Sequence, residues 1–296
     1  MRPLVQSCVR GQIHQSSSIF SAFSRGRQCT PMSYFAVLYS SVNNVDRWTQ
    51  ETIDFVLSQG DSMYNAVRHS QEYFDYTELP VSVYLTDSNH HLSCQFFSHH
   101  SNFLHCAASN AVTRSLCLAD AVREVCAESL GCLVTANETT IAVMKSGDKY
   151  YLFDSHCRDH LGRSTDDGTA VLLQFSSPED IHSHIRRLHG IFSTSTRECN
   201  AWADHDRRCQ FDVVGIRANV DTPQVVGVSQ STSHCAAGVP VSSSVVGVSV
   251  TSMSSTSSVS TVRSYASVVS GVSHHPVMST VSVSYTHLTL PTKRIV

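Results

Sequence analysis

The sequence lacks an apolar run long enough to cross a membrane, which takes roughly 18 residues. Basic residues are also scarce, because 21 lysines and arginines stand against 24 aspartates and glutamates and give a net charge of −3 with histidine neutral. A strongly basic surface, the usual feature of proteins that bind nucleic acid, is therefore excluded. We expect no membrane-spanning segment and no nucleic-acid partner.

Closely paired cysteines are missing as well. The 11 cysteines are scattered, and none of them forms a Cys-x₂-Cys pair with another. This spacing excludes a small disulfide scaffold and indicates reduced thiols in an intracellular protein, cytoplasmic or nuclear. Acidic residues are absent from the first 45 positions, which hold four arginines and many serines. That composition is typical of a mitochondrial presequence, so import is the alternative location.

A segment rich in histidine and cysteine is a candidate zinc site. Both residue types bind zinc, but the spacings here differ from those of known zinc sites. The competing interpretation is a set of solvated histidines around a hairpin, and we expect no metal or other cofactor. The residues concerned are His90, His91, Cys94, His99, His100, His105 and Cys106.

Aromatic and charged side chains almost vanish from the C-terminal third, where serine, valine and threonine dominate. Too little large apolar surface remains there to form a core, which predicts a disordered tail. The last 13 residues resemble translated sequencing adapter and are set aside from the fold. The expected parts are an N-terminal extension (1–9), one domain (10–192), a linker (193–220), the low-complexity tail (221–283) and the adapter-like end (284–296).

Apolar periodicity within the expected domain predicts helices first, and then strands with helices between them. This order predicts an α+β fold in which the first helix packs on a central, mainly antiparallel sheet. Gly60 is expected to end the second helix, and Ser177 to cap the last one. Helices are expected over residues 30–41, 49–58, 61–68, 115–129 and 178–188, and strands over 81–85, 92–97, 130–136, 140–144, 150–154 and 169–175.

Cys29 stands where an irregular segment becomes an apolar helix. The unpaired N–H groups and positive dipole at a helix start lower a thiol pKa, and we expect nearby Arg25 and Arg27 to add to this effect. The residues that follow are apolar all round, so the helix should be buried and should hold the thiol rigidly. Cys29 is therefore a candidate nucleophile, against the alternative of an inert apolar side chain.

A cysteine nucleophile needs a base, a group that orients the base, and donors for the oxyanion. Asp154 and His156 end a hydrophobic strand, and the two-residue period of a regular strand places both on one side. His156 is the candidate base and Asp154 the orienting acid, against the alternative of a polar turn. Gln15 is the favoured oxyanion donor together with the Cys29 backbone N–H, and Gln12 and Gln28 are its rivals.

Three segments of the sequence contain these candidate residues. The segments are Gly11-Gln12-Ile13-His14-Gln15, Arg25-Gly26-Arg27-Gln28-Cys29-Thr30-Pro31-Met32-Ser33, and Gly147-Asp148-Lys149-Tyr150-Tyr151-Leu152-Phe153-Asp154-Ser155-His156-Cys157-Arg158-Asp159. They resemble the herpesvirus large tegument protein deubiquitinase family, whose module also occurs in uncharacterised animal proteins, many of them linked to mobile elements. The similarity covers about residues 10–192 and includes residues 161–162 and 167–171.

The resemblance implies a papain-like cysteine peptidase that cleaves after the C-terminal glycines of ubiquitin. By that resemblance Cys29 is the nucleophile, His156 the base, Asp154 the orienting acid and Gln15 the oxyanion donor. We therefore expect a thiol-dependent isopeptidase whose partner is ubiquitin or a ubiquitin-like modifier. The alternatives are a catalytically silent module of the same fold that binds ubiquitin or another partner, and a papain-like enzyme of acyl transfer.

Overall fold

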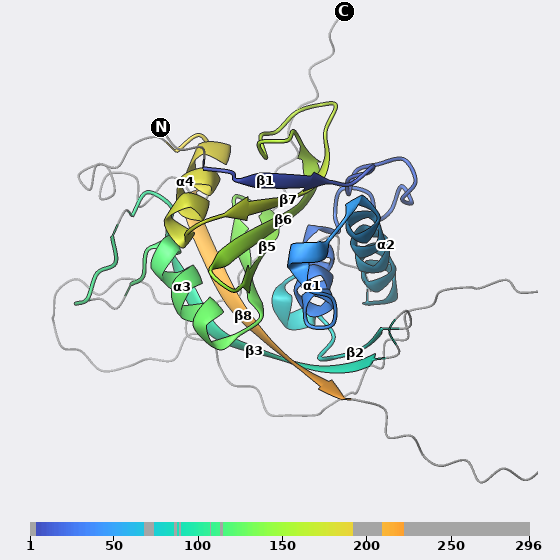
Figure 1. The fold of residues 1–296 in the computed structure, drawn as a ribbon, viewed down its shortest axis with the longest axis horizontal. Helices are drawn as coiled ribbons and strands as arrows, with labels where there is room; N and C mark the ends of the chain where they lie inside the picture. The colour runs from blue at the N-terminus through green and yellow to red at the C-terminus, as the bar shows by residue number, and fades with distance from the viewer. Residues whose placement is uncertain are drawn as a thin grey trace, which may run out of the picture. The chain divides into compact units, whose positions relative to one another are not determined.

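The computed structural model (Figure 1) describes part of the chain. The chain divides into two compact units, Met1–Met253 and Ser254–Val296, and every described residue belongs to the first. The tail and the adapter-like end expected beyond residue 221 lie outside the described residues, as does most of the expected linker. The described residues are 4–67, 74–85, 88, 90–106, 108–112, 115–191 and 209–221.

Eight strands of the described residues form one sheet. Figure 1 shows how they are arranged. They are β1 (Ser7–Arg10), β2 (Ser82–Leu85), β3 (His90–Phe103), β4 (Gly131–Ala136), β5 (Thr139–Ser146), β6 (Lys149–Arg158), β7 (Thr169–Phe175) and β8 (Gln210–Asp221). Their order across the sheet is β1-β7-β6-β5-β4-β8-β3-β2. Every neighbouring pair is antiparallel, which confirms the predicted type of sheet.

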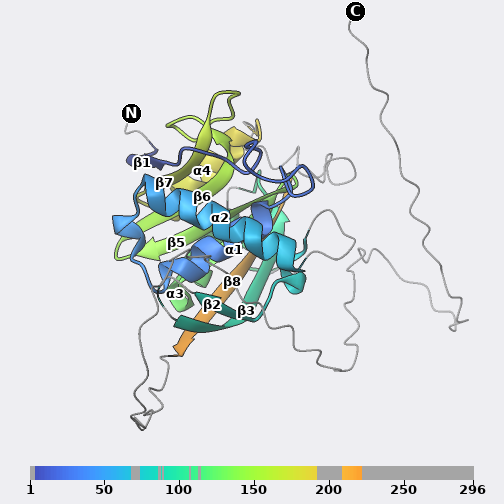
Figure 2. The ribbon, with the colours of Figure 1, turned by 90° about the vertical axis from the view of Figure 1, so that its right-hand side faces the viewer.

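Helices cover both faces of the sheet, α1 and α2 on one face and α3 and α4 on the other (Figures 1 and 2). The helices are α1 (Cys29–Ser40), α2 (Gln50–Val67), α3 (Leu118–Glu128) and α4 (Pro178–Leu188), with the short 3₁₀ helices η1 (Val45–Arg47) and η2 (Tyr76–Glu78). The α+β fold is therefore confirmed. Of these helices in the described part of the chain, none combines the length and apolar character that membrane crossing requires.

The central strands are buried on both faces because each face carries its own core. In β5, Ala142 and Met144 join the core beneath α1 and α2, whereas Ile141 and Val143 join the core beneath α3 and α4. The same alternation continues in β6 and β7. A sheet covered on both sides explains why these strands are nearly continuous apolar runs in the sequence.

Helix α1 is the most enclosed helix of the fold. It packs against β5 and β6 on one side and α2 on the other, and Figure 2 shows α2 lying in front of it. All residues from Cys29 to Tyr39 are buried as a result. The apolar pattern on every side of this segment predicted that environment, and the helix begins at Cys29 itself.

Gly60 lies inside α2, so the prediction that it ends a helix and that a new helix starts at residue 61 is wrong. The reason is close packing between helices. A Cβ atom added to Gly60 would lie 2.5 Å from the Cα atom of Met32 in α1. Glycine is present because it lets the two helices approach each other.

Two strands extend the fold beyond the expected domain. Residues 7–10 form β1, which pairs with β7, and Gln210–Asp221 form β8 between β4 and β3. The expected N-terminal extension is therefore wrong for residues 7–9, and the expected linker is wrong for residues 210–220. Strand β8 lies between β4 and β3 in the sheet. The sequence pattern of a segment does not show which strands it will pair with, so this position was not predicted.

Candidate active site

Cys29 is the first residue of α1, and Gln28 is the N-cap residue. The first N–H groups of a helix have no partner within the helix and point outward from its start. The Cys29 side chain is only 6% exposed, because the sheet and the preceding loop enclose it. The sulfur atom therefore sits at the positive end of a rigid, buried helix.

Asp154 and His156 lie close to each other near the end of β6. The His156 backbone N–H donates to Asp154 Oδ1 at 2.9 Å, and His156 Nδ1 lies 2.6 Å from the same oxygen. The two side chains therefore lie on the same side, as expected, although the pairing of β6 with β7 shifts between Asp154 and Arg158. A bulge of this kind makes the end of the strand irregular.

His156 also acts on Cys29. Interactions with His156, with the Thr30 side chain and with the Thr140 backbone lower the pKa of the Cys29 thiol. Because Nδ1 is engaged by Asp154, Nε2 is the ring nitrogen left for Cys29. The structure thus brings Cys29 next to His156, and His156 is hydrogen-bonded to Asp154, so two distant segments form one series of side chains.

The charges in this series favour a thiolate next to an imidazolium. Burial raises the pKa of the Cys29 thiol, but the hydrogen bond and charge of His156, together with Thr140 and Thr30, outweigh burial and lower the pKa. Burial lowers the pKa of His156, but the charge and hydrogen bond of Asp154 and contact with Cys29 raise it to about 9. Both shifts favour a thiolate nucleophile beside an imidazolium that can donate a proton.

The expected contribution of Arg25 and Arg27 to the Cys29 pKa is not found. The guanidinium group of Arg25 donates to the carbonyls of Ser18 and Phe20, and that of Arg27 donates to the carbonyl of Phe23. Neither arginine is among the causes that lower the thiol pKa. Both side chains hold the loop before the helix, and the charge that acts on the thiol comes from His156.

Asp154 is held by a residue for which the sequence suggested no role. Arg158, which is 5% exposed, donates from Nε to Asp154 Oδ2 at 2.7 Å. Burial raises the pKa of Asp154, but the charge and hydrogen bonds of His156 and the charge of Arg158 hold that pKa far below its usual range. In the sequence, Arg158 stands four residues after Asp154, which alone does not indicate a contact. The irregular pairing of β6 between these two residues is what lets the side chains meet.

Gln15 approaches the site from the loop after β1. Its backbone N–H donates to the Ser155 carbonyl at 2.7 Å, and Ser155 Oγ donates to Gln15 Oε1 at 3.1 Å. With Oε1 fixed on Ser155, the amide NH₂ is the end left to donate elsewhere. Ser155, between Asp154 and His156, is thus a positioning residue that sequence reasoning missed.

The two other glutamines contact helix α2, Gln28 through its side chain and Gln12 through its backbone. Gln28 donates from Nε2 to Asp61 Oδ1 at 2.8 Å, and the exposed Gln12 donates from its backbone N–H to Asp54 Oδ1 at 2.8 Å. Both contacts are with α2. Of the three glutamines, Gln15 is the one that the fold ties to the strand carrying His156.

A pocket of about 180 Å³ lies next to Thr30, the residue that follows Cys29 in α1. Its wall also includes Thr140 of β5, Tyr76 of η2, His99 of β3 and Asp212 of β8. Cys29, His156 and Asp154 do not line this pocket.

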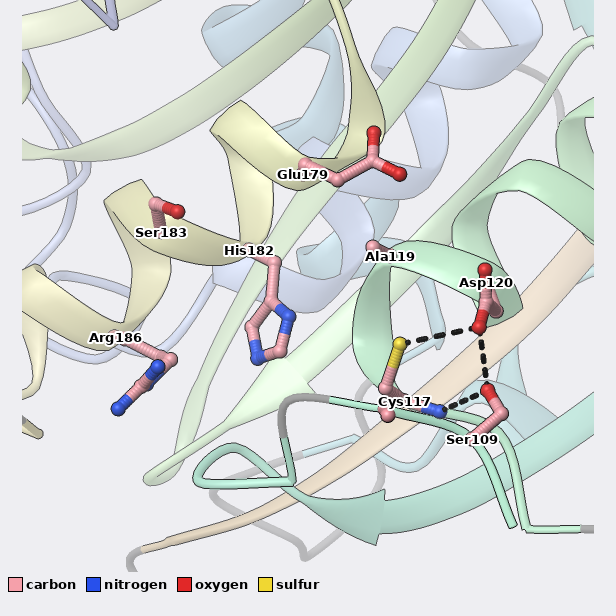
Figure 3. Close-up of a pocket in the computed structure, with 9 residues that line it drawn as sticks. Ser109, Cys117, Ala119, Asp120, Glu179, His182, Ser183 and Arg186 are labelled. Atoms are coloured by element: carbon pink, nitrogen blue, oxygen red, sulfur yellow. Dashed lines mark hydrogen bonds between the residues drawn. The ribbon is translucent and has the colours of Figure 1, made fainter. Parts of the chain in front are cut away.

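Another cysteine and histidine share a pocket of about 360 Å³ between α3 and α4, drawn in Figure 3. There Cys117 Sγ donates to Asp120 Oδ2 at 3.4 Å, whereas His182 Nε2 faces the Leu104 carbonyl at 2.8 Å. The two side chains stand apart in Figure 3, and no hydrogen bond joins them. This pocket does not pair a thiol with a base, unlike the site at Cys29.

The histidines of the predicted hairpin are spread along β3. His91 Nε2 lies 2.8 Å from Ser82 Oγ on β2, and His99 Nε2 lies 3.0 Å from Asp212 Oδ1 on β8. Among the residues that the structure describes, no three His, Cys, Asp or Glu side chains are grouped closely enough to hold a metal ion. The hairpin pairing of β2 with β3 itself is as predicted, with a longer second strand.

Comparison with known proteins gives a family and a fold. No curated protein matches the chain. A solved structure that is similar is the ubiquitin-specific protease encoded by murine cytomegalovirus tegument protein M48, determined in complex with a ubiquitin-based suicide substrate. The two share 15% identity and a TM-score of 0.58, over 75% of this chain and 90% of that one.

The model of the herpesvirus tegument protein N-terminal conserved region matches residues 10–211, which is more than half of the chain. That span starts within β1 and ends within β8, and it holds Cys29, Asp154 and His156. Neither match bears on the predicted link to mobile elements, which stays a prediction. The chain belongs to the family of the herpesvirus tegument protein N-terminal conserved region.

Proposed function

We propose that the protein is a thiol-dependent isopeptidase that cleaves after the C-terminal glycine of ubiquitin or a ubiquitin-like modifier. The observation that supports the proposal is that Cys29, at the start of a buried helix, interacts with His156, which is hydrogen-bonded to Asp154. Membership of the tegument protein family supports it, as does the fold shared with a viral ubiquitin-specific protease.

In the proposed first step, the Cys29 thiolate attacks the carbonyl carbon of the scissile amide, and the carbonyl oxygen becomes an oxyanion. The Cys29 backbone N–H at the helix start and the Gln15 amide NH₂ are the donors proposed for that oxyanion. Protonated His156 then gives its Nε2 proton to the departing amine, which is the ε-amine when the bond is an isopeptide to lysine. The carbon–nitrogen bond breaks and leaves a thioester on Cys29.

In the second step, neutral His156 takes a proton from water, and the resulting hydroxide equivalent attacks the thioester carbonyl. The carbon–sulfur bond breaks, which releases the glycine carboxylic acid and restores the thiolate beside protonated His156, and the acid then loses its proton to the solvent as a carboxylate. Asp154 stays ionised throughout, because it accepts from His156 and Arg158 in a buried setting. Its proposed role is to hold the imidazole in the useful orientation and to favour the imidazolium.

The test is covalent labelling of the full chain by ubiquitin that carries a C-terminal vinyl methyl ester. We expect one adduct, located on Cys29 by mass spectrometry, and none in the Cys29→Ser variant. Cys157→Ser is the matched control, since Cys157 is a half-buried thiol next to His156 whose loss should leave labelling intact.

Two results would contradict the proposal: no adduct on folded wild-type protein, or an adduct that persists in Cys29→Ser. In the first case, ubiquitin that still binds without reacting would favour the silent binding module. If neither labelling nor binding occurs but Cys29 remains reactive toward small electrophiles, another papain-like acyl transfer would be favoured. Probes built from other ubiquitin-like modifiers distinguish the modifier class.

A further inference from the structure

We propose that Arg158 is a positioning residue that fixes the Asp154 carboxylate, and through it His156, in the orientation that activates Cys29. The inference rests on the proposed function for its catalytic meaning. The proposed effect of Arg158 on the Cys29 thiolate can be measured with any electrophile that reacts with the thiolate, and it needs no ubiquitin. It adds a fourth side chain to the series of Cys29, His156 and Asp154.

The two oxygens of Asp154 have separate partners. Oδ1 receives both donors of His156, at 2.6 Å and 2.9 Å, while Oδ2 receives Arg158 Nε at 2.7 Å. The side chains of Asp154 and Arg158 are 3% and 6% exposed, so little water is available to replace either contact. A buried carboxylate with one unpaired oxygen is costly, and without Arg158 it would rotate or take up a proton.

Arg158 is itself anchored. Its Nη1 atom donates to Ser164 Oγ, and the two residues also form an isolated antiparallel β-bridge. Gly168 packs directly on the Arg158 backbone, because an added Cβ would lie 2.4 Å from the Arg158 carbonyl oxygen. The guanidinium is therefore placed by the turn that follows β6, and its planar set of donors suits two fixed acceptors at once.

Three histidines also lie near Cys29, His156 and Asp154, and their pKa values are lowered. His184 and His189 on the α4 side interact with Asp154 and Arg158, and burial lowers the pKa of both, to about 4 for His184. His14 faces His156 from the loop after β1, and burial together with the His156 charge lowers its pKa. These three histidines are neutral near pH 7.

Asp159, next to Arg158, is held by Arg163, whose Nε donates to it at 2.7 Å. Since the surrounding histidines are neutral, the permanent cation that bonds to Asp154 is Arg158. Removing this charge raises the pKa of the Asp154 carboxyl, and a carboxylate that is displaced or protonated no longer favours the imidazolium that stabilises the Cys29 thiolate. Both effects move the onset of thiolate reactivity to higher pH.

The test is the pH dependence of Cys29 alkylation by iodoacetamide in the full chain, followed by mass spectrometry of the peptide that contains Cys29. We expect the acid limb of the Arg158→Gln profile to move up by about one pH unit or more. Arg158→Lys keeps the charge but loses the two-acceptor geometry, so its limb should fall between those of the wild type and Arg158→Gln. Arg163→Gln, in the same turn but bonded to Asp159, should match the wild type.

An unshifted acid limb in folded Arg158→Gln, with only a lower melting temperature, would overturn the proposal and leave Arg158 as a holder of the turn. If Arg158→Gln fails to fold by circular dichroism, Arg158→Lys carries the decision, and an unshifted limb there overturns it too. The assay contains no ubiquitin. Failure of the ubiquitin probe on wild-type protein would therefore reject the proposed function while the alkylation profile still judges Arg158.

Discussion

Replacement of Gly60 by alanine tests the packing that places the nucleophile helix. Glycine inside a helix usually costs about 0.5–1 kcal/mol relative to alanine, so an ordinary site would gain stability from this change. Gly60 is different because the new methyl carbon would lie 2.5 Å from Met32 Cα and 2.6 Å from Met32 Cγ. Carbon atoms prefer a separation of about 3.5–4.0 Å.

The conflict is with backbone, so no change of side-chain rotamer in Met32 can remove it. Helices α1 and α2 would have to separate by about 1 Å to restore normal contact. Overpacking of a close interface costs roughly 1–3 kcal/mol, which exceeds the gain in helix propensity. We expect Gly60→Ala to lower the free energy of unfolding by about 1–2 kcal/mol.

Urea unfolding followed by circular dichroism measures this difference, and iodoacetamide alkylation of Cys29 at pH 7 measures its effect on the site. Alkylation should slow, because Met32 lies one turn after Cys29 in α1 and a shifted helix loosens the contact with His156. Ser58→Ala is the matched control on the exposed side of α2 and should be neutral or slightly stabilising. A Gly60→Ala protein as stable as the wild type would refute the packing argument.

Three further predictions concern the site and its surroundings. The His156→Gln change removes the interactions of His156 that lower the Cys29 pKa and leaves burial and the threonine contacts. A thiol at its ordinary pKa is about 1% ionised at pH 7, so alkylation of Cys29 should slow about 10-fold or more. His160→Gln changes an exposed neighbour and should leave the alkylation rate unchanged. Gln15→Ala should slow hydrolysis of a ubiquitin C-terminal amide by roughly 100-fold, yet leave iodoacetamide alkylation unchanged because that reaction forms no oxyanion. Burial lowers the pKa of His184 from 6.5 to about 4, so within this window the unfolded chain binds a proton that the folded chain does not. Stability should therefore fall by about 3 kcal/mol as the pH drops through this window, and His184→Leu should lack that part of the loss in urea titrations.

Local features of the sequence were sufficient to predict most elements. The last helix begins at Pro178, and Ser177 Oγ accepts from the Asp180 N–H at 3.2 Å, as its capping pattern predicted. The helix at Cys29 is buried all round, as its apolar composition predicted. Hydrogen bonds and side-chain periods within a few residues control such features, so they are legible in a single chain segment.

Long-range contacts decided what the sequence could not. Gly60 reads as a helix end by itself, and only the approach of Met32 explains its place within α2. Residues 210–221 follow a segment that looked like a linker, yet they fill the gap between β4 and β3. Strand partners of this kind depend on which edges the rest of the fold leaves open.

The candidate site likewise combines features predicted from local sequence with contacts between distant segments. Local patterns were enough to predict a cysteine at the start of a buried helix and an Asp-x-His pair at the end of a strand. The contact of His156 with Cys29, the bond of Ser155 to Gln15 and the bond of Arg158 to Asp154 became visible only in the folded protein. Those contacts need a bulged strand and a buried, low-dielectric setting, and both arise only when distant segments pack together.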